Sequence, residues 1–222
     1  MGTTVAKAFL PLAGTPMLVY SLRTLSAVRG VTSMTLVVGA DHLDVATSVI
    51  HQHAPWPLTI RVTQGGAERQ DSVAAGLSLV DPGADVVLVH DAARPFVSPA
   101  CVQACIDAAA ATGAAIVALP ARDTVKVVDQ QATIRQTVDR RTIWLAQTPQ
   151  VFRAPLLRQA YQQARRDRYV GTDDAELVER IGGTVSVVPG DSSNRKITTP
   201  DDLRWAEWYV RTRGSTASED LS

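Results

Sequence analysis

The sequence has little of several things that a chain of 222 residues commonly uses. Only three of its 22 basic residues are lysines, and 22 acidic residues leave no net charge. A chain without net charge has no field that would draw it to bulk nucleic acid or to an anionic membrane, so neither is an expected partner. Its two cysteines, Cys101 and Cys105, are too few for a disulfide framework, and we expect buried, reduced thiols of a cytosolic protein.

Long apolar runs are also scarce. The longest charge-free apolar stretch, residues 108–121, is too short and too rich in Ala, Gly and Pro to cross a bilayer. The first four residues have neither the basic nor the apolar region of a secretory signal. The remaining composition, 45% hydrophobic and 20% charged, excludes disordered and fibrous classes. We therefore expect a cytoplasmic protein with one domain over residues 1–213 and a flexible tail over residues 214–222.

Four runs rich in β-branched residues are continuous rather than alternating, which is typical of strands buried on both faces of a sheet. They lie at residues 34–39, 58–63, 85–90 and 114–119. Segments with helical spacing alternate with them, at residues 14–29, 41–53, 68–80 and 98–112. Because strands and helices alternate at this spacing, the sequence predicts an α/β fold with a mostly parallel sheet.

The alternation breaks after Pro120. Residues 124–129 and 133–139 are strand-like, carry polar residues at alternate positions and are joined by three residues, which predicts a hairpin that projects from the sheet. This gives a β-arm over about residues 122–147. The elements expected after it are helices at 154–166 and 172–181, a strand at 184–188 and a last helix from 200 to about 213.

Three motifs follow predicted strands, at residues 64–69, 90–95 and 191–199, and ligands of such sheets bind at the carboxyl ends of the strands. After the third strand, Asp91 and Arg94 flank two small residues, and Arg is suited to bidentate phosphate binding. The alternative is an Asp–Arg ion pair that only closes the loop. After the second strand, Gly65 and Gly66 open a helix, which predicts either an anion-accepting turn or a turn alone.

A lysine follows the last predicted strand. In a chain that otherwise uses Arg, a Lys at position 196 suggests that a compact point charge is needed there. No set of nucleophile, His and acid stands out in the sequence, and nothing places a base beside Ser72.

Taken in order along the chain, seven motifs resemble those of the bacterial 2-C-methyl-D-erythritol 4-phosphate cytidylyltransferases. They lie at residues 7–14, 65–73, 90–95, 122–126, 138–150, 172–174 and 194–203. The resemblance implies a Rossmann-like nucleotidyltransferase fold (GT-A-like) and a homodimer formed through the projecting arm. It also implies transfer of a cytidylyl group from CTP to 2-C-methyl-D-erythritol 4-phosphate with Mg²⁺, releasing pyrophosphate, in non-mevalonate isoprenoid precursor biosynthesis.

Matched motif by motif, the resemblance assigns roles to single residues, and it assigns no metal ligands. Lys7 and Lys196 would be the catalytic cations that neutralise the triphosphate and the transition state. Substrate contacts would come from Asp91, Ala92, Arg94, Thr148 and Thr172, and from Thr124 and Arg140 reaching the neighbouring subunit's substrate. The cytidine-binding turn would comprise Gly65, Gly66, Ala67 and Ser72. An acidic or amide residue is commoner in the family at the position of Ala67, so one contact there would be made by backbone only.

The resemblance departs in one respect. In the family, a strand and a Gly-rich phosphate loop ending in Arg precede the motif that begins here at Lys7, whereas Met1 is followed almost at once by that motif. We expect either a start codon misplaced downstream of the natural one, which the intact later motifs favour, or a true truncation that binds CTP poorly. Because the first strand is central in this fold, we expect two neighbouring strands with unpaired ladders.

Two rival functions stay open. A ribitol 5-phosphate cytidylyltransferase would share the fold and most motifs, although residues 138–140 followed by Trp144 favour the erythritol substrate. A catalytically impaired paralogue acting as a dimeric binding protein is the rival of another class, and tight, Mg²⁺-dependent binding of CTP would argue against it.

Overall fold

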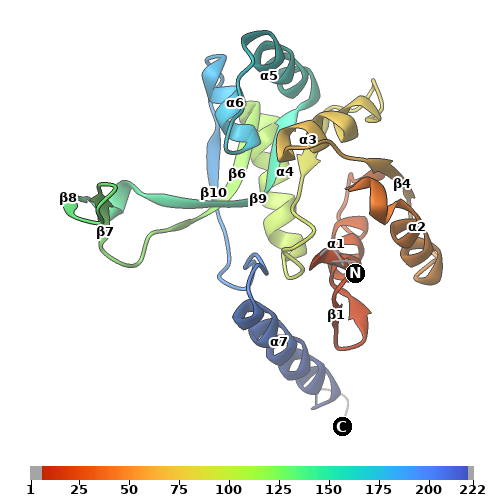
Figure 1. The fold of residues 1–222 in the computed structure, drawn as a ribbon. Coiled ribbons are helices and arrows are strands. Elements are labelled where there is room, and N and C mark those ends of the chain that lie inside the picture. Colours follow the sequence, from red (N-terminus) through yellow and green to blue (C-terminus); the bar gives the residue numbers. More distant parts are fainter. Residues whose placement is uncertain (1–6, 220–222) are drawn as a thin grey trace.

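A computed structural model describes residues 7–219, with side chains described as far as residue 212 (Figure 1). The first half of the chain forms short elements and a two-stranded parallel unit. Its elements are η1 (Lys7–Phe9), β1 (Pro11–Leu12), β2 (Thr15–Pro16), α1 (Met17–Ser26), β3 (Ser33–Val38), η2 (Ala40–His42), α2 (Leu43–Gln52), β4 (Thr59–Gln64) and α3 (Arg69–Ser78). The strands predicted at 34–39 and 58–63 are thereby confirmed within one residue at each end.

The second half holds the larger sheet and the arm. Its elements are β5 (Val86–Val89), α4 (Pro99–Thr112), β6 (Ala114–Pro120), β7 (Val125–Val128), β8 (Ile134–Val138), η3 (Arg140–Thr142), β9 (Trp144–Arg153), α5 (Ala154–Asp167), α6 (Asp174–Arg180), β10 (Ser186–Pro189) and α7 (Pro200–Glu219). Helix α4 begins as the sequence predicts, because the Ser98 hydroxyl accepts from the Cys101 N–H and Pro99 occupies the first turn.

Strand β9 is not among the strands that the sequence predicts. It lies between β5 and β6 in the sheet ordered β10-β6-β9-β5 and runs antiparallel to both neighbours. A proline inside a run argues against a central strand, and Pro149 lies inside this one. The structure accommodates it at an irregularity, because the pairing with β6 shifts register between Ile116 and Ala118, opposite residues 147–149.

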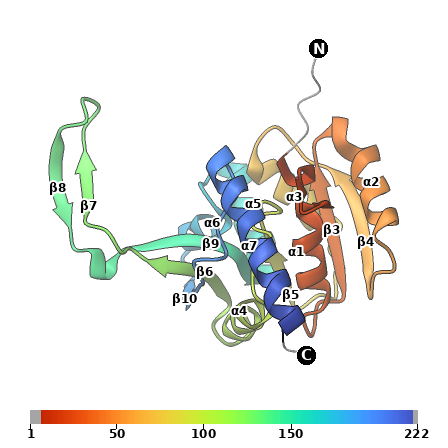
Figure 2. The ribbon, with the colours of Figure 1, turned by 90° about the horizontal axis from the view of Figure 1, so that it is seen from below.

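The predicted arm is present. Strands β7 and β8 pair antiparallel, with Val125 opposite Val138, and the hairpin extends away from the rest of the molecule (Figure 2). Several large apolar side chains of the arm and its base are exposed, among them Val128 (51%), Ile134 (59%) and Leu145 (58%). An isolated two-stranded hairpin is marginally stable in water, so an arm of this kind gains from a surface to pack against.

Helix α7 is longer than predicted. The expected end was near residue 213, with a flexible tail from residue 214, but the helix continues to Glu219. The predicted helix end is therefore wrong, whereas the flexibility of residues 214–222 stays a prediction, and residues 220–222 lie outside the described part of the chain. The start of α7 is fixed by Asp202, whose carboxylate accepts from the backbone N–H groups of Thr198 and Thr199 at 3.0 and 2.9 Å.

The sheet is divided between β3 and β5. Within residues 7–219, β3 pairs only with β4, and β5 pairs only with β9. A cavity of about 400 Å³ lies between the two strands, lined by residues 33–37 of β3 and by all of β5, as well as by parts of α1 and α3. The expected pair of neighbouring strands with unpaired ladders is thus confirmed for the described residues.

The division leads to a prediction for hydrogen exchange. Backbone amides of β3 and β5 that face the cavity have no strand partner among residues 7–219, so they should exchange at least about tenfold faster than the amides of β6, which is paired on both sides. Exchange followed by NMR or mass spectrometry at neutral pH checks this. The β3 amides that pair with β4 are the internal control, and equal protection of both sets would contradict the divided sheet.

Candidate functional site

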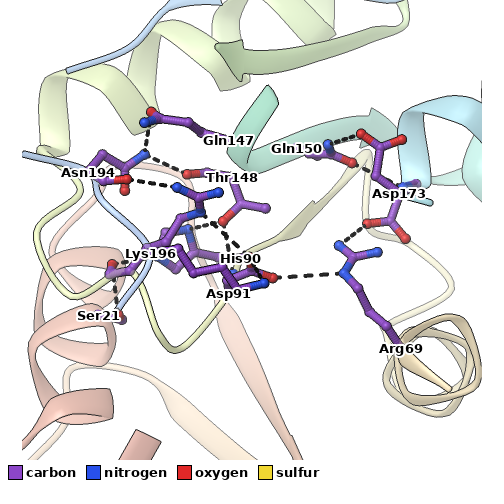
Figure 3. Close-up of polar contacts among 12 residues, drawn as sticks. Ser21, Arg69, His90, Asp91, Gln147, Thr148, Gln150, Asp173, Asn194 and Lys196 are labelled. Atoms are coloured by element: carbon purple, nitrogen blue, oxygen red, sulfur yellow. Dashed lines mark hydrogen bonds and ion pairs between the residues drawn. The ribbon is translucent and has the colours of Figure 1, made fainter. Parts of the chain in front are cut away.

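The site is built around the carboxylate of Asp91, at the carboxyl end of β5 (Figure 3). Three cations from three separate segments surround it. Lys196 Nζ lies 3.0 Å and Arg94 Nε lies 3.5 Å from Asp91 Oδ2, while Arg69 Nε lies 3.8 Å from Oδ1. The Asp91 side chain is only 17% exposed. Burial would raise its pKa, but the charge and hydrogen bond of Lys196, with the charges of Arg69 and Arg94, hold the pKa below its ordinary value.

Two hydrogen bonds join the loop at residues 90–95 to the segment at residues 191–199. Arg94 Nη1 donates to the carbonyl of Asn194 at 2.9 Å, and the Ile197 N–H donates to the carbonyl of Ala93 at 2.8 Å. These bonds put Lys196 beside Asp91. Arg94 and Lys196, which the sequence singled out separately, therefore belong to one cluster, and the Asp–Arg pair is more than a loop closure.

Asn194 ties this segment to β9. Its side chain is almost fully buried, and its amide donates to Gln147 Oε1 at 3.0 Å and to the Thr148 carbonyl at 2.8 Å (Figure 3). Both acceptors lie where the register of β9 shifts. The irregularity caused by Pro149 is thus used to hold the Lys196 segment, as bulges next to sites often do.

Thr148 connects β9 to the loop through His90. Its hydroxyl oxygen accepts from the Asp91 N–H at 3.0 Å and lies 3.1 Å from His90 Nδ1, while His90 Nε2 lies 3.1 Å from the Arg94 carbonyl. A carbonyl can only accept, so Nε2 carries the proton and Nδ1 accepts from the Thr148 hydroxyl. Burial lowers the pKa of His90 to about 4, so the imidazole is neutral at physiological pH. Thr148 is predicted as a substrate contact, and in the structure its hydroxyl holds the loop at residues 90–95 through Asp91 and His90.

The glycine turn lies beside the cluster, at the start of α3. The Gly66 N–H donates to Ser72 Oγ at 3.2 Å, and the Gly65 N–H donates to the Val38 carbonyl at 2.7 Å. A Cβ atom on Gly65 would lie 2.4 Å from Ser72 Oγ, and one on Gly66 would lie 2.3 Å from Asp71 Cβ. Both positions therefore need glycine, because the helix packs against the bare backbone. The exposed Ala67 follows directly.

Lys7, the other predicted catalytic cation, contacts the segment that carries Lys196. Lys7 Nζ donates to the carbonyl of Thr198, two residues after Lys196. The structure therefore brings Lys7 and Lys196 to one strip of chain, although nearly the whole sequence separates them. Lys7 itself is exposed.

Thr172 lies just before α6, and its polar groups are occupied. Its N–H and its hydroxyl both donate to Glu176 Oε2, at 2.6 and 2.8 Å. These bonds, with one from Tyr169, lower the pKa of Glu176 to about 2. A phosphate could be bound by Thr172 only after Glu176 releases it.

Two predicted residues lie away from the cluster. Thr124 immediately precedes β7, and Arg140 begins η3, where its guanidinium donates to the Arg122 carbonyl. Both therefore belong to the arm, which points away from the body that holds Asp91 (Figure 2). Within a single chain the structure does not bring them to the site.

Sequence reasoning missed a second layer of site residues, comprising Arg69, His90, Gln147, Gln150, Tyr161, Asp174 and Asn194. Several of them stand in the motifs, but only the contacts reveal their roles. The available signal was chemical: Asp173 and Asp174 are adjacent carboxylates at the start of a predicted helix. Polar residues at such positions are buried only when they are bonded.

The cluster suits anionic ligands. Asp91 and Asp174 together neutralise two of the three cationic charges, and the partly exposed Lys196 leaves a cationic surface at the sheet rim. The imidazole of His90 is neutral and fully bonded, and Ser72 bonds to backbone groups alone. Among residues 7–219 no group of three or more His, Cys, Asp or Glu could hold a metal ion. The arrangement can bind and orient phosphates, and its described residues offer no activated side-chain nucleophile.

No helix in the described part of the chain combines the length and apolarity needed to cross a membrane. The two cysteines are free thiols, as expected, but Cys101 is half-buried and not buried as predicted. Cys105 is buried, and burial raises its pKa to about 12.

Comparison with known proteins gives one family. Its sequence model, described as 2-C-methyl-D-erythritol 4-phosphate cytidylyltransferase, matches residues 1–212. A curated relative of that name from Acidobacterium capsulatum is 45% identical over 213 residues, covering 94% of this chain and 89% of the relative. Another, from Syntrophus aciditrophicus, is 45% identical and covers 95% of this chain and 90% of the relative.

Solved structures agree. The chain resembles a 4-diphosphocytidyl-2C-methyl-D-erythritol synthase from Anaerococcus prevotii with a TM-score of 0.85 at 31% identity, over 95% of this chain and 92% of that one. It resembles the cytidylyltransferase from Thermus thermophilus with a TM-score of 0.78 at 36% identity, over 92% and 93%. The predicted α/β nucleotidyltransferase fold is confirmed.

The buried imidazole predicts a pH dependence of stability. Between pH 6.5 and about 4 the unfolded chain binds a proton at His90 that the folded chain does not, so the free energy of unfolding should fall as pH falls through this window. One proton contributes at most about 1.4 kcal/mol per pH unit. Denaturant unfolding of the protein and of a His90→Gln variant checks this, since the variant should lose the His90 part of the slope. An NMR titration that puts the His90 pKa near 6.5 would contradict it.

Proposed function

The chain belongs to the 2-C-methyl-D-erythritol 4-phosphate cytidylyltransferase family, and we propose that its Asp91 cluster is where the two phosphorylated substrates meet. The family's reaction transfers a cytidylyl group from CTP to 2-C-methyl-D-erythritol 4-phosphate in isoprenoid precursor synthesis. One observation carries the proposal: Lys196, Arg94 and Arg69 converge on one carboxylate at the carboxyl end of β5.

The reaction needs positioned charge more than it needs a base. An oxygen of the sugar phosphate bonds to the α-phosphorus of CTP, the bond from that phosphorus to the bridging oxygen breaks, and pyrophosphate leaves with the electron pair. A phosphate monoester has a second pKa near 6, so its oxygen is already deprotonated at neutral pH. The neutral, fully bonded His90 fits this chemistry. Bringing two polyanions together is the larger cost, and fixed cations reduce it.

Within this scheme the residues divide by position. Lys196 and Lys7 supply charge to the triphosphate and to the transition state. Asp91, with the adjacent Ala92 backbone and Arg94, contacts the sugar phosphate or the cytidine end. The contacts of Lys196 with Asp91 and of Lys7 with Thr198 support these roles, because they bring both lysines to the segment at residues 196–198.

The glycine turn and α6 complete the site. The cytidine binds to the turn formed by Gly65, Gly66, Ala67 and Ser72. Because Ala67 has no polar side chain, backbone groups of the turn contact the base or the ribose there. Thr172 binds the sugar phosphate after the hydrogen bonds between Thr172 and Glu176 have broken. The close packing of the turn on α3 supports this, because it fixes the backbone that a ligand would approach.

We propose that Mg²⁺ is bound through the phosphates of the nucleotide rather than by a set of protein ligands. The described residues offer no three-ligand cluster, and the carboxylate at the centre of the site is already paired with three cations. Mg²⁺ is commonly bound through substrate phosphates and water with few protein ligands. The described residues therefore do not form a metal site of their own.

A homodimer formed through the arm is the second part of the proposal. The exposed apolar side chains of the hairpin and its base support it, since they gather on a projection that no other described element covers (Figure 2). In such a dimer Thr124 and Arg140 reach the neighbouring subunit's substrate. A cytoplasmic location is proposed with it, supported by the two free thiols.

Lys196→Ala should lower kcat for pyrophosphate release about 100-fold, because it removes one fixed charge from the transition state while leaving the buried core untouched. Release is measured with CTP, Mg²⁺ and 2-C-methyl-D-erythritol 4-phosphate, with circular dichroism as a check on folding. Arg211→Ala is the control, since Arg211 is an exposed cation on α7 whose ion pair is with Glu207 of the same helix. Unchanged turnover in the Lys196 variant would remove this residue from the mechanism.

Mixing two inactive variants tests the shared site. Lys196→Ala disables a body and Arg140→Ala disables an arm, so each homodimer should be nearly inactive. After unfolding and refolding of an equimolar mixture, about a quarter of the sites combine an intact body with an intact arm, and about a quarter of the wild-type activity should return. Sedimentation of the protein at several concentrations establishes the dimer. No recovery in a mixture that forms mixed dimers would show that Arg140 acts within its own subunit.

A further inference from the structure

Asp174 is a fully buried carboxylate at the start of α6. An ionised carboxylate is costly to bury unless its oxygens are paired and hydrogen-bonded. Its Oδ1 accepts from the Tyr161 hydroxyl at 2.5 Å, and its Oδ2 accepts from Arg69 Nη2 at 2.7 Å. The first bond comes from α5 and the second from α3, so the carboxylate joins three helices.

The surroundings of this carboxylate are fixed. The Gln150 side-chain oxygen accepts from the Asp174 and Ala175 N–H groups at 3.1 and 3.3 Å, and its amide donates to Asp173 Oδ2 at 2.8 Å (Figure 3). Burial raises the pKa of Tyr161, so its hydroxyl keeps its proton and remains a donor. These bonds fix the position of Asp174, and one oxygen of its carboxylate faces Arg69.

Arg69 connects Asp174 to the Asp91 carboxylate. Its Nη2 is held by Asp174 and its Nε faces Asp91 Oδ1 at 3.8 Å. Lys196 and Arg94 both face the other oxygen, Oδ2. With Arg69 on one oxygen and two cations on the other, the plane of the Asp91 carboxylate has one favoured rotation. The start of α3 is itself fixed by a capping box between Glu68 and Asp71.

We propose that the buried pair Tyr161–Asp174 positions Arg69, and that Arg69 thereby fixes the rotation of the Asp91 carboxylate and the place of the Lys196 ammonium. Tyr161, Asp174 and Arg69 are then positioning residues for cytidylyl transfer, in a chain of contacts that runs from α5 through α6 and α3 to the rim. The proposal rests on the proposed function of the Asp91 cluster.

A double-mutant cycle separates this role from plain stabilisation. Asp174→Asn, Arg69→Ala and the double variant are compared for kcat/KM, with thermal unfolding measured alongside. If Asp174 acts through Arg69, each single change should cost about tenfold or more, and the double change no more than the larger single one. If Asp174 only stabilises the fold, its cost should be the same with or without Arg69, and that outcome would overturn the proposal.

A milder pair guards against unfolding of the Asp174 variant. Tyr161→Phe removes one hydroxyl, and Tyr20→Phe makes the same change at a hydroxyl that bonds the Leu12 carbonyl and neither Asp174 nor Arg69. Tyr161→Phe should lower kcat/KM several-fold in the wild-type background and have no effect beside Arg69→Ala. Tyr20→Phe should leave kcat/KM unchanged in both. An equal effect of Tyr161→Phe in both backgrounds would contradict the chain of contacts.

A spectroscopic measurement keeps the positioning role testable apart from turnover. The NMR signals of the Asp91 carboxyl carbon and of the Lys196 ammonium should shift in Tyr161→Phe and stay in place in Tyr20→Phe. If the wild-type protein released no pyrophosphate, the proposed function would fail, whereas these shifts would still support or refute the positioning. Signals that do not move in Tyr161→Phe would overturn it.

Discussion

The pairing of Asp91 with three cations is the interaction on which the rest of the site depends. A carboxylate so little exposed is stable only while its charge is compensated, and the compensating groups come from α3, from the loop after β5 and from the segment before α7. One acidic side chain thus gathers three parts of the chain. It also keeps three like charges close together before any phosphate arrives, and such preorganised charge is what phosphoryl chemistry requires.

The same contacts help to hold a divided sheet together. Between β3 and β5 the described chain has a cavity instead of strand pairing. Polar bridges cross from the β4–α3 unit to the rest of the molecule at its rim. Arg69 contacts Asp91 and Asp174, and the Gln70 side chain bonds the Tyr169 carbonyl at 3.0 Å and the Gly171 N–H at 2.9 Å. Binding geometry and cohesion of the two units are therefore carried by overlapping residues.

Much of this could be predicted from the sequence, because periodicity and turn chemistry are local. The strands before Gly65 and His90, the helix that starts at Ser98 and the hairpin followed from such patterns. Strand β9 did not, since Pro149 argues against a strand and only the register shift opposite Val117 shows how the sheet tolerates it. The cations were found as single motifs, but their meeting at Asp91 is a tertiary fact. For the buried network of Asp174, the local signal in the sequence is limited to the adjacent carboxylates Asp173 and Asp174 at a helix start.

The most direct test of this account is the Asp91→Asn variant, which keeps the shape of the side chain and removes its charge. Three cations would then lack their common partner, and Lys196 would lose its one ion pair in the described part of the chain. The account predicts a fall in kcat/KM for pyrophosphate release of about 100-fold or more with both substrates present, in a protein whose circular dichroism is unchanged. An Asp91→Asn variant that turns over CTP at the wild-type rate would contradict it.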